Sequence, residues 1–287
     1  MTSSYSRRLL VTCASTMFAS ATFPVAMPHS PLALRAIGAS DTKELDASDD
    51  FVVQAREIAR QLGVRHPENL RVLMDLADGE GGGALGADVF GRSAIWISES
   101  IYRGFHQTPS PTSTVQDIEA DPAREEVEFI LAHECAHIAN NHSLKMTSFI
   151  PLSMFGSYAI ATKVPHKLIG AVLGFGLIAA GGWYLSWHME HEADHLAASL
   201  GQRFRDGGLS TFERSRVRNC FLKSYFDTRM ITEEGNYLGD TSHPWLTTRI
   251  HHLEHMECDE HDHACIFCSW FTETVKQGLN LVRSKVL

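Results

Sequence analysis

The residues best suited to chemistry form one pentad, His133-Glu134-Cys135-Ala136-His137, in a stretch that otherwise favours a helix. Residues four apart on an α-helix lie about one turn apart on the same face, so both imidazoles can approach one metal ion. Glu134 then lies beside the open position of that metal, where hydrolysis needs a base. The pattern is typical of a zinc site that activates water.

A second pair of polar residues can complete such a site. A hydrolytic zinc ion needs a third protein ligand and keeps its fourth position for water. Glu190 and Asp194 are again four residues apart, so their carboxylates share one face of a predicted helix. Glu190 can bind the metal, and Asp194 can accept the free N–H of a ligand histidine and fix its tautomer.

The order of three motifs resembles peptidase family M48. H-E-x-x-H at 133–137 is followed, after a hydrophobic insertion, by E-x-x-A-D at 190–194 and by H-P-x-x-x-x-R-I-x-x-L at 243–253. The resemblance covers roughly residues 50–255. The family includes HtpX-like proteases, CAAX prenyl proteases and mitochondrial Oma-type peptidases.

The resemblance implies a role for each matching residue. One zinc ion per chain would be held by His133, His137 and Glu190, with Glu134 as the general base. Asp194 would be the hydrogen-bonding partner behind a ligand. The activity implied is that of a zinc metalloendopeptidase.

The third motif adds two residues to the site. The resemblance implies that His243 lies near the substrate carbonyl, and we expect Arg249 to brace the carboxylates of the site. The chain departs from the family pattern where Trp187 replaces an arginine and where Gly83-Ala84 replaces Asn-Ala. Neither departure touches a predicted ligand, so both concern the handling of substrate.

The elements that must position these residues are predicted to be helices around a short sheet. Residues 51–62 have helical spacing and stop at Gly63, whereas 70–76 and 94–98 predict strands. We expect the strand at 94–98 to line the cleft and pair with extended substrate. The glycines at 81–83 predict a flexible turn, because the lysine and hydroxyl of a phosphate loop are missing.

The metal helix has a predicted start at Asp121-Pro122, an N-cap residue followed by a proline suited to the first helical position. The fold class predicted is α+β. It is a mostly helical, zincin-like metallopeptidase domain with a short sheet and an inserted hydrophobic helical hairpin.

The hairpin is predicted from two uncharged stretches, 146–162 and 168–187, around a basic tip at 163–167. The second stretch is 20 residues long, enough to cross a hydrocarbon core of about 30 Å, and the first, at 17 residues, is at the lower limit. We expect residues 146–187 to enter a bilayer, with the tip at one interface and the zinc site at the other. A buried or interfacial helical pair in a soluble protein is the alternative.

The N-terminal residues 1–40 predict a targeting segment before a domain at 41–287. They contain no acidic residue, and Arg7 and Arg8 precede an apolar run with small residues at Ala19-Ser20-Ala21. These features suit a secretory signal or a mitochondrial transit peptide. An uncleaved, loose tail is the alternative.

The C-terminal segment 251–287 is rich in histidine and cysteine. Cys265-x-x-Cys268 with Cys258 or a histidine could bind a second zinc ion, whereas a disulfide or free thiols are the simpler interpretations. The sequence leaves these states open.

Bulk composition limits the function classes. The chain has 287 residues, 44% of them hydrophobic, enough for one good core. Its net charge of −9 argues against nucleic acid as a partner. We expect protein or peptide substrates, among them membrane or misfolded proteins, and contact with membrane lipid.

The predicted location is a membrane, the mitochondrial inner membrane in a eukaryote or the cell envelope in a bacterium. Two other functions remain open. One is a zinc-binding but non-catalytic scaffold or chaperone-like module, which would have no need for Glu134. The other is a soluble secreted protease whose hairpin belongs to the core.

Overall fold

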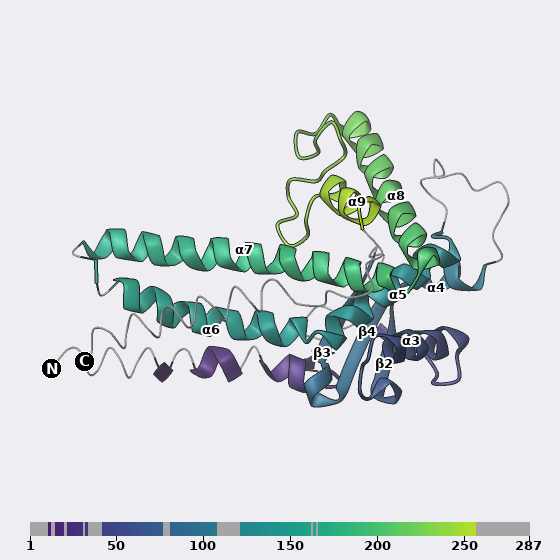
Figure 1. Ribbon diagram of the computed structural model, residues 1–287, viewed down its shortest axis with the longest axis horizontal. Helices are drawn as coiled ribbons and strands as arrows, with labels where there is room; N and C mark the ends of the chain where they lie inside the picture. The colour runs from purple at the N-terminus through teal and green to yellow at the C-terminus, as the bar shows by residue number, and fades with distance from the viewer. Residues whose placement is uncertain are drawn as a thin grey trace. The chain divides into compact units, whose positions relative to one another are not determined.

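The computed structural model describes residues 11–12, 15–19, 22–30, 32–33, 42–76, 81–107, 121–161, 163–164 and 166–256. By contacts the chain divides into two compact units, 1–255 and 256–287. Every helix and strand given below belongs to the first unit (Figure 1). Cys258, Cys265 and Cys268, like Arg7, Arg8 and Ser20-Ala21 of the predicted leader, lie outside the described residues.

The sheet has four strands, β1 (Thr42–Glu44), β2 (Leu70–Asp75), β3 (Gly82–Ala87) and β4 (Arg92–Ser98), in the order β1-β2-β4-β3. β2 and β4 run parallel, and both outer pairs are antiparallel. The strands predicted at 70–76 and 94–98 are therefore confirmed. The pairing with extended substrate predicted for 94–98 is wrong, because β4 is paired on both sides and β1 and β3 form the edges.

The predicted turn at 81–83 is also wrong for two of its three glycines, since Gly82 and Gly83 belong to β3. Gly83 pairs with Trp96 of β4, and a Cβ at position 83 would lie 2.2 Å from the indole ring. Glycine is needed there because the ring covers the strand, as in other strands that a neighbour approaches closely. β3 packs beside the metal helix.

The helices are α3 (Asp50–Gln61), α4 (Glu99–His106), α5 (Arg124–Ala139), α6 (His142–Ala161), α7 (Lys167–Ser199), α8 (Gln202–Phe226) and α9 (Leu246–Glu254), with 3₁₀ turns η1 (Pro67–Asn69) and η2 (Asp88–Phe90). The predicted helix at 51–62 is α3, whose first turn is capped by the Asp49 carboxylate accepting from Phe51 N–H at 2.9 Å. The fold is α+β and mostly helical, as the sequence predicted.

The metal helix α5 begins later than predicted. Asp121-Pro122 lie outside it, because the Glu126 carboxylate accepts a hydrogen bond from Ala123 N–H at 2.6 Å and so caps a helix that starts at Arg124. Asp121 instead forms an ion pair with Arg103 at 3.1 Å. The capping carboxylate stands inside the helix rather than before it.

α5 lies in the core and is held by α8. A Cβ at Gly207 of α8 would lie 2.2 Å from the Glu125 carbonyl oxygen, so the two helices touch through backbone. Glu126, only 1% exposed, accepts hydrogen bonds from Arg214 at 2.8 Å and from Ser210 at 2.6 Å. A buried, paired carboxylate of this kind holds its helices in one register.

α6 and α7 form the predicted hairpin and lie side by side (Figure 1). Ser157 Oγ donates to the Gly174 carbonyl oxygen at 3.0 Å between them. α7 does not end with its apolar part at 187 but continues without a break to Ser199. The membrane segment that was predicted and the second ligand motif therefore share one helix.

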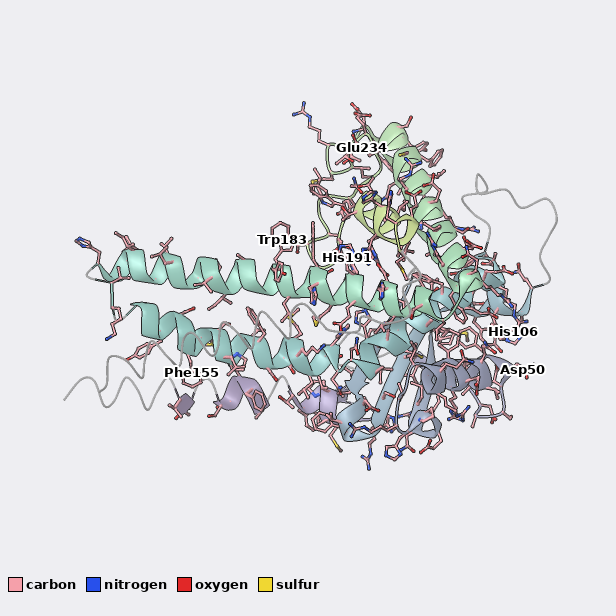
Figure 2. The ribbon with its side chains drawn as sticks, in the orientation of Figure 1. Asp50, His106, Phe155, Trp183, His191 and Glu234 are labelled. Carbon is pink, nitrogen blue, oxygen red and sulfur yellow. The ribbon has the colours of Figure 1, made fainter. Side chains whose placement is uncertain are left out.

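Much of the apolar surface of this hairpin is uncovered within the part of the chain that the structure describes. Phe155 projects from α6 away from α7, and Trp183 projects from α7 away from α6 (Figure 2). Eight large hydrophobic side chains of α7 are more than half exposed: Leu168, Ile169, Val172, Leu173, Phe175, Leu177, Trp183 and Tyr184. Among the described residues one helix, Leu168–Ser199, is long and apolar enough to cross a membrane, with a mean hydropathy of 1.8.

Part of the predicted leader packs on the sheet. Val25 and Ala33, at 1% and 0% exposure, are buried against Leu85 of β3. The His29 ring nitrogen Nε2 lies 3.0 Å from the Ser93 carbonyl oxygen. These residues thus contribute to the fold, and the targeting role of residues 1–40 stays a prediction.

Candidate metal centre

The three predicted ligands meet in one place. α5 supplies His133 and His137, whose Nε2 atoms face each other at 3.0 Å. α7 supplies Glu190, with Oε2 3.4 Å from His133 Nε2 and Oε1 3.3 Å from His137 Nε2. The structure thus brings together side chains that are more than fifty residues apart in the chain.

The donor set fits a zinc ion. Ligand atoms about 2 Å from a tetrahedrally coordinated zinc lie roughly 3.3 Å apart, close to the separations found here. Glu190 Oε2 is buried and accepts no hydrogen bond from the described residues. A buried carboxylate oxygen without a donor costs free energy, as do two imidazole lone pairs that face each other, unless a cation lies between them.

Asp194 holds the first ligand from behind. It is fully buried, and its Oδ1 lies 2.9 Å from His133 Nδ1. A proton on Nδ1 leaves the Nε2 lone pair of His133 directed at the ligand cluster. Burial lowers the pKa of His133, but the carboxylates of Asp194 and Glu190 outweigh burial and raise that pKa to about 10. The pocket therefore favours a positive charge at this position.

Arg249 braces the carboxylates from the other side. Its guanidinium donates to both oxygens of Asp194, at 2.7 and 2.6 Å, and one nitrogen lies 3.5 Å from Glu190 Oε2. The same group stacks on the Phe212 ring of α8, 4.2 Å from its centre. A two-point contact of this kind fixes the Asp194 carboxylate in orientation as well as in charge.

Glu134 and His243 lie at the edges of the cluster. Glu134 is buried, at 8% exposure, one residue along α5 from the first ligand. His243 is about half exposed, and its Nε2 lies 3.7 Å from Glu190 Oε2. Its other ring nitrogen lies 2.8 Å from Asp240 Oδ2, so this carboxylate orients the ring. Sequence reasoning missed Asp240, because the loop before α9 has no periodicity.

Sequence reasoning also missed His142, which supports the second ligand. His142 Nδ1 lies 2.8 Å from His137 Nδ1, and His142 Nε2 lies 3.1 Å from Glu192 Oε2. Burial lowers the pKa of His142 to about 4, so the ring is neutral and carries one N–H. A proton chain from His137 through His142 to Glu192 then directs His137 Nε2 at the cluster.

A local signal for His142 exists in the sequence. Asn141 has a positive φ of 56°, the left-handed conformation that ends many helices and that asparagine tolerates. This residue lies between α5 and α6, and across this turn the first residue of α6 contacts the last turn of α5.

A second group of potential metal ligands lies on α9: His251, Glu254 and His255. All three are exposed, and they lie in the last turn of the helix and at its C-cap, His255. This group is separate from the centre formed by α5 and α7.

Comparison with protein-family models gives a match to peptidase family M48 over residues 84–257. The matched region contains both ligand-bearing helices and the segment with His243 and Arg249. Comparisons with curated proteins and with solved structures give no match.

Proposed function

The chain belongs to peptidase family M48, whose model matches more than half of it, and from this premise we propose a membrane-anchored zinc metalloendopeptidase. The family implies a zinc metallopeptidase. The observation that carries the proposal is the convergence of His133, His137 and Glu190, with Glu134 buried beside them. A binding site alone would have no use for that extra carboxylate.

Each residue of the site has its own role in the proposed reaction. His133, His137 and Glu190 would hold a zinc ion, which would supply a Lewis acid for the scissile carbonyl and for the attacking water. Glu134 accepts the proton of the attacking water and passes it to the leaving nitrogen. His243 hydrogen-bonds to the carbonyl oxygen as negative charge develops there. Asp194 and His142 keep the two imidazoles in the tautomer that binds metal.

We further propose that the α6–α7 hairpin lies in a bilayer and that the substrates are membrane or misfolded proteins. The uncharged part of α7, residues 168–187, would span about 30 Å as a helix. The exposed apolar side chains of α7 support this location. They argue against a soluble protein whose hairpin belongs to its core, because the described residues leave them uncovered.

One preparation can test both parts of this proposal. The full chain in phospholipid vesicles should cleave casein, lose this activity with a zinc chelator, and stay in the pellet after alkaline carbonate extraction. The double variant Phe175→Lys, Leu177→Lys should move to the supernatant, because each charge costs about 2.5–3.5 kcal/mol near a bilayer centre. Both positions are exposed, so a soluble fold would tolerate the lysines.

The matched control places lysines at Val53 and Leu76, which are also more than half exposed but lie outside the hairpin. This control should stay in the pellet. Release of the parent chain by carbonate would contradict the membrane anchor alone. Casein cleavage that is unaffected by the chelator, or no cleavage at all, would contradict the zinc peptidase function.

A further inference from the structure

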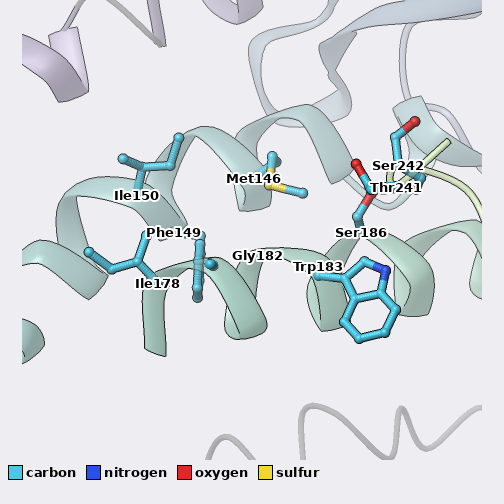
Figure 3. A pocket seen from close by; sticks show the side chains of 10 residues that line it. Met146, Phe149, Ile150, Ile178, Gly182, Trp183, Ser186, Thr241 and Ser242 are labelled. Carbon is cyan, nitrogen blue, oxygen red and sulfur yellow. Dashed lines mark hydrogen bonds between the residues drawn. The ribbon is translucent and has the colours of Figure 1, made fainter. Parts of the chain in front are cut away.

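A cavity of about 520 Å³ lies between α6 and α7 at the end of the hairpin that adjoins the metal centre (Figure 3). Met146, Phe149 and Ile150 line it from α6, and Ile178 and Gly182 line it from α7. Its size falls within the range of about 300–1,000 Å³ that is usual for ligand sites. It therefore has room for at least one large side chain from a bound molecule.

The chemistry of the cavity selects apolar groups. None of its ten lining residues is charged, and the polar ones carry only hydroxyls. One of these, Ser186 Oγ, donates to the Ser242 carbonyl oxygen at 2.7 Å and so already uses its proton. A charged group would lose its hydration in this cavity without gaining a counter-charge.

One end of the cavity, at Ser186 and Ser242, lies next to the metal centre. Ser242 lines it and immediately precedes His243, whose ring reaches Glu190. On α7, Ser186 lies four residues before Glu190, a rise of about 6 Å. Consecutive residues of an extended peptide are only about 3.8 Å apart, so a residue beside the scissile bond can place its side chain here.

A small residue keeps the cavity open. Gly182 faces the Phe149 ring, and a Cβ at position 182 would lie 3.5 Å from it, an ordinary contact. A larger side chain at this position can therefore be accommodated without a backbone clash, and it would occupy space that is now empty.

We propose that this cavity is a specificity subsite that receives one large aliphatic or aromatic side chain of the substrate, at a fixed position beside the scissile bond. The inference rests on the proposed peptidase function and names its substrate preference. The occupant is a polypeptide side chain because Ser242 and Ser186, which line the cavity, lie immediately before His243 and one helical turn before Glu190 of the proposed site. The enzyme would therefore cut at apolar segments, which folded soluble proteins keep buried.

The first measurement maps cleavage sites. Denatured casein is digested by the full chain in phospholipid vesicles, and the cut positions are identified by mass spectrometry. Leu, Ile, Phe and Met should be enriched at one position next to the cut. Two peptides that differ only there, Phe against Ala, should differ at least tenfold in kcat/KM, as expected when a pocket loses several methylenes.

Two leucine variants of α7 then test whether the cavity causes the preference for Phe over Ala. Gly182→Leu should reduce the Phe-to-Ala ratio at least fivefold by occupying the cavity. Gly176→Leu, where an added Cβ meets nothing within 4 Å, should keep the parent ratio. Both variants replace a glycine of α7 by leucine, so changes in helix propensity cancel. Unchanged zinc content shows that both variants fold.

The proposal is overturned if the parent shows no enrichment, or if the two variants change the ratio equally. It is also overturned if Gly182→Leu slows both peptides by the same factor, the result expected for a lipid chain in the cavity. If the chelator stops cleavage but no residue type is enriched beside the cut, the subsite is refuted and the peptidase function is not. If no cleavage is sensitive to the chelator, the proposed peptidase function is refuted as well.

Discussion

Glu134→Gln should stop peptide hydrolysis while leaving zinc binding intact. Glutamine keeps the shape of the side chain and its hydrogen-bonding reach but cannot accept a proton. General-base catalysis contributes on the order of a hundred- to ten-thousand-fold, so the rate of casein cleavage should fall at least that far. Zinc per chain and thermal stability should stay close to the parent, because no proposed ligand is lost.

The matched control is Glu125→Gln, a glutamate of the same helix that lies in its first turn, away from the ligands. It should cleave casein at the parent rate. Equal activity of Glu134→Gln and the parent would exclude the proposed mechanism. If Glu134→Gln lost zinc together with activity, Glu134 would instead be a ligand of the metal.

His133→Ala and Glu190→Ala should each remove one zinc ion per chain. Two protein ligands would remain in either variant, whereas zinc sites of this class need three. Loss of a partner behind a ligand typically weakens metal binding 10–100-fold, so loss of a ligand itself should weaken it by more than about a hundredfold. The measurement is metal content after dialysis against a competing chelator, with casein cleavage in parallel.

His251→Ala provides the comparison, since His251 belongs to the separate exposed group on α9. It should keep the catalytic zinc and the activity. If His133→Ala and Glu190→Ala both retained the full metal content of the parent, the three-ligand centre would be refuted. A zinc ion in the cysteine-rich tail would add a constant amount to all variants.

Helical periodicity explains why much of the centre could be predicted from sequence. The spacing of four between His133 and His137, and again between Glu190 and Asp194, places each pair on one face whatever the surrounding fold. Residues whose position depends on an irregular turn between helices could not be found this way. His142 reaches His137 only because Asn141 adopts a left-handed conformation.

The order of the strands in the sheet could not be predicted from local sequence patterns. Gly82 and Gly83 have the composition of a turn, and only the indole of Trp96 across the sheet explains them as a strand. The same pairing places β4 inside the sheet, because β3 takes the edge beside it. The start of α5 was misjudged because its cap is a carboxylate three residues inside the helix.

The buried pair of Asp194 and Arg249 has a consequence for biosynthesis. All proposed ligands leave the ribosome by residue 190, but the cation that compensates Asp194 arrives 55 residues after it. Until α9 docks, Asp194 lacks the guanidinium that donates to both of its oxygens, and burial of a carboxylate without its ion-pair partner costs several kcal/mol. A nascent chain would therefore contain every ligand and still lack peptidase activity. Unfolded proteins near it would not be cleaved. A truncation ending before Leu246 should cleave no casein, and activity there would show that the centre matures earlier.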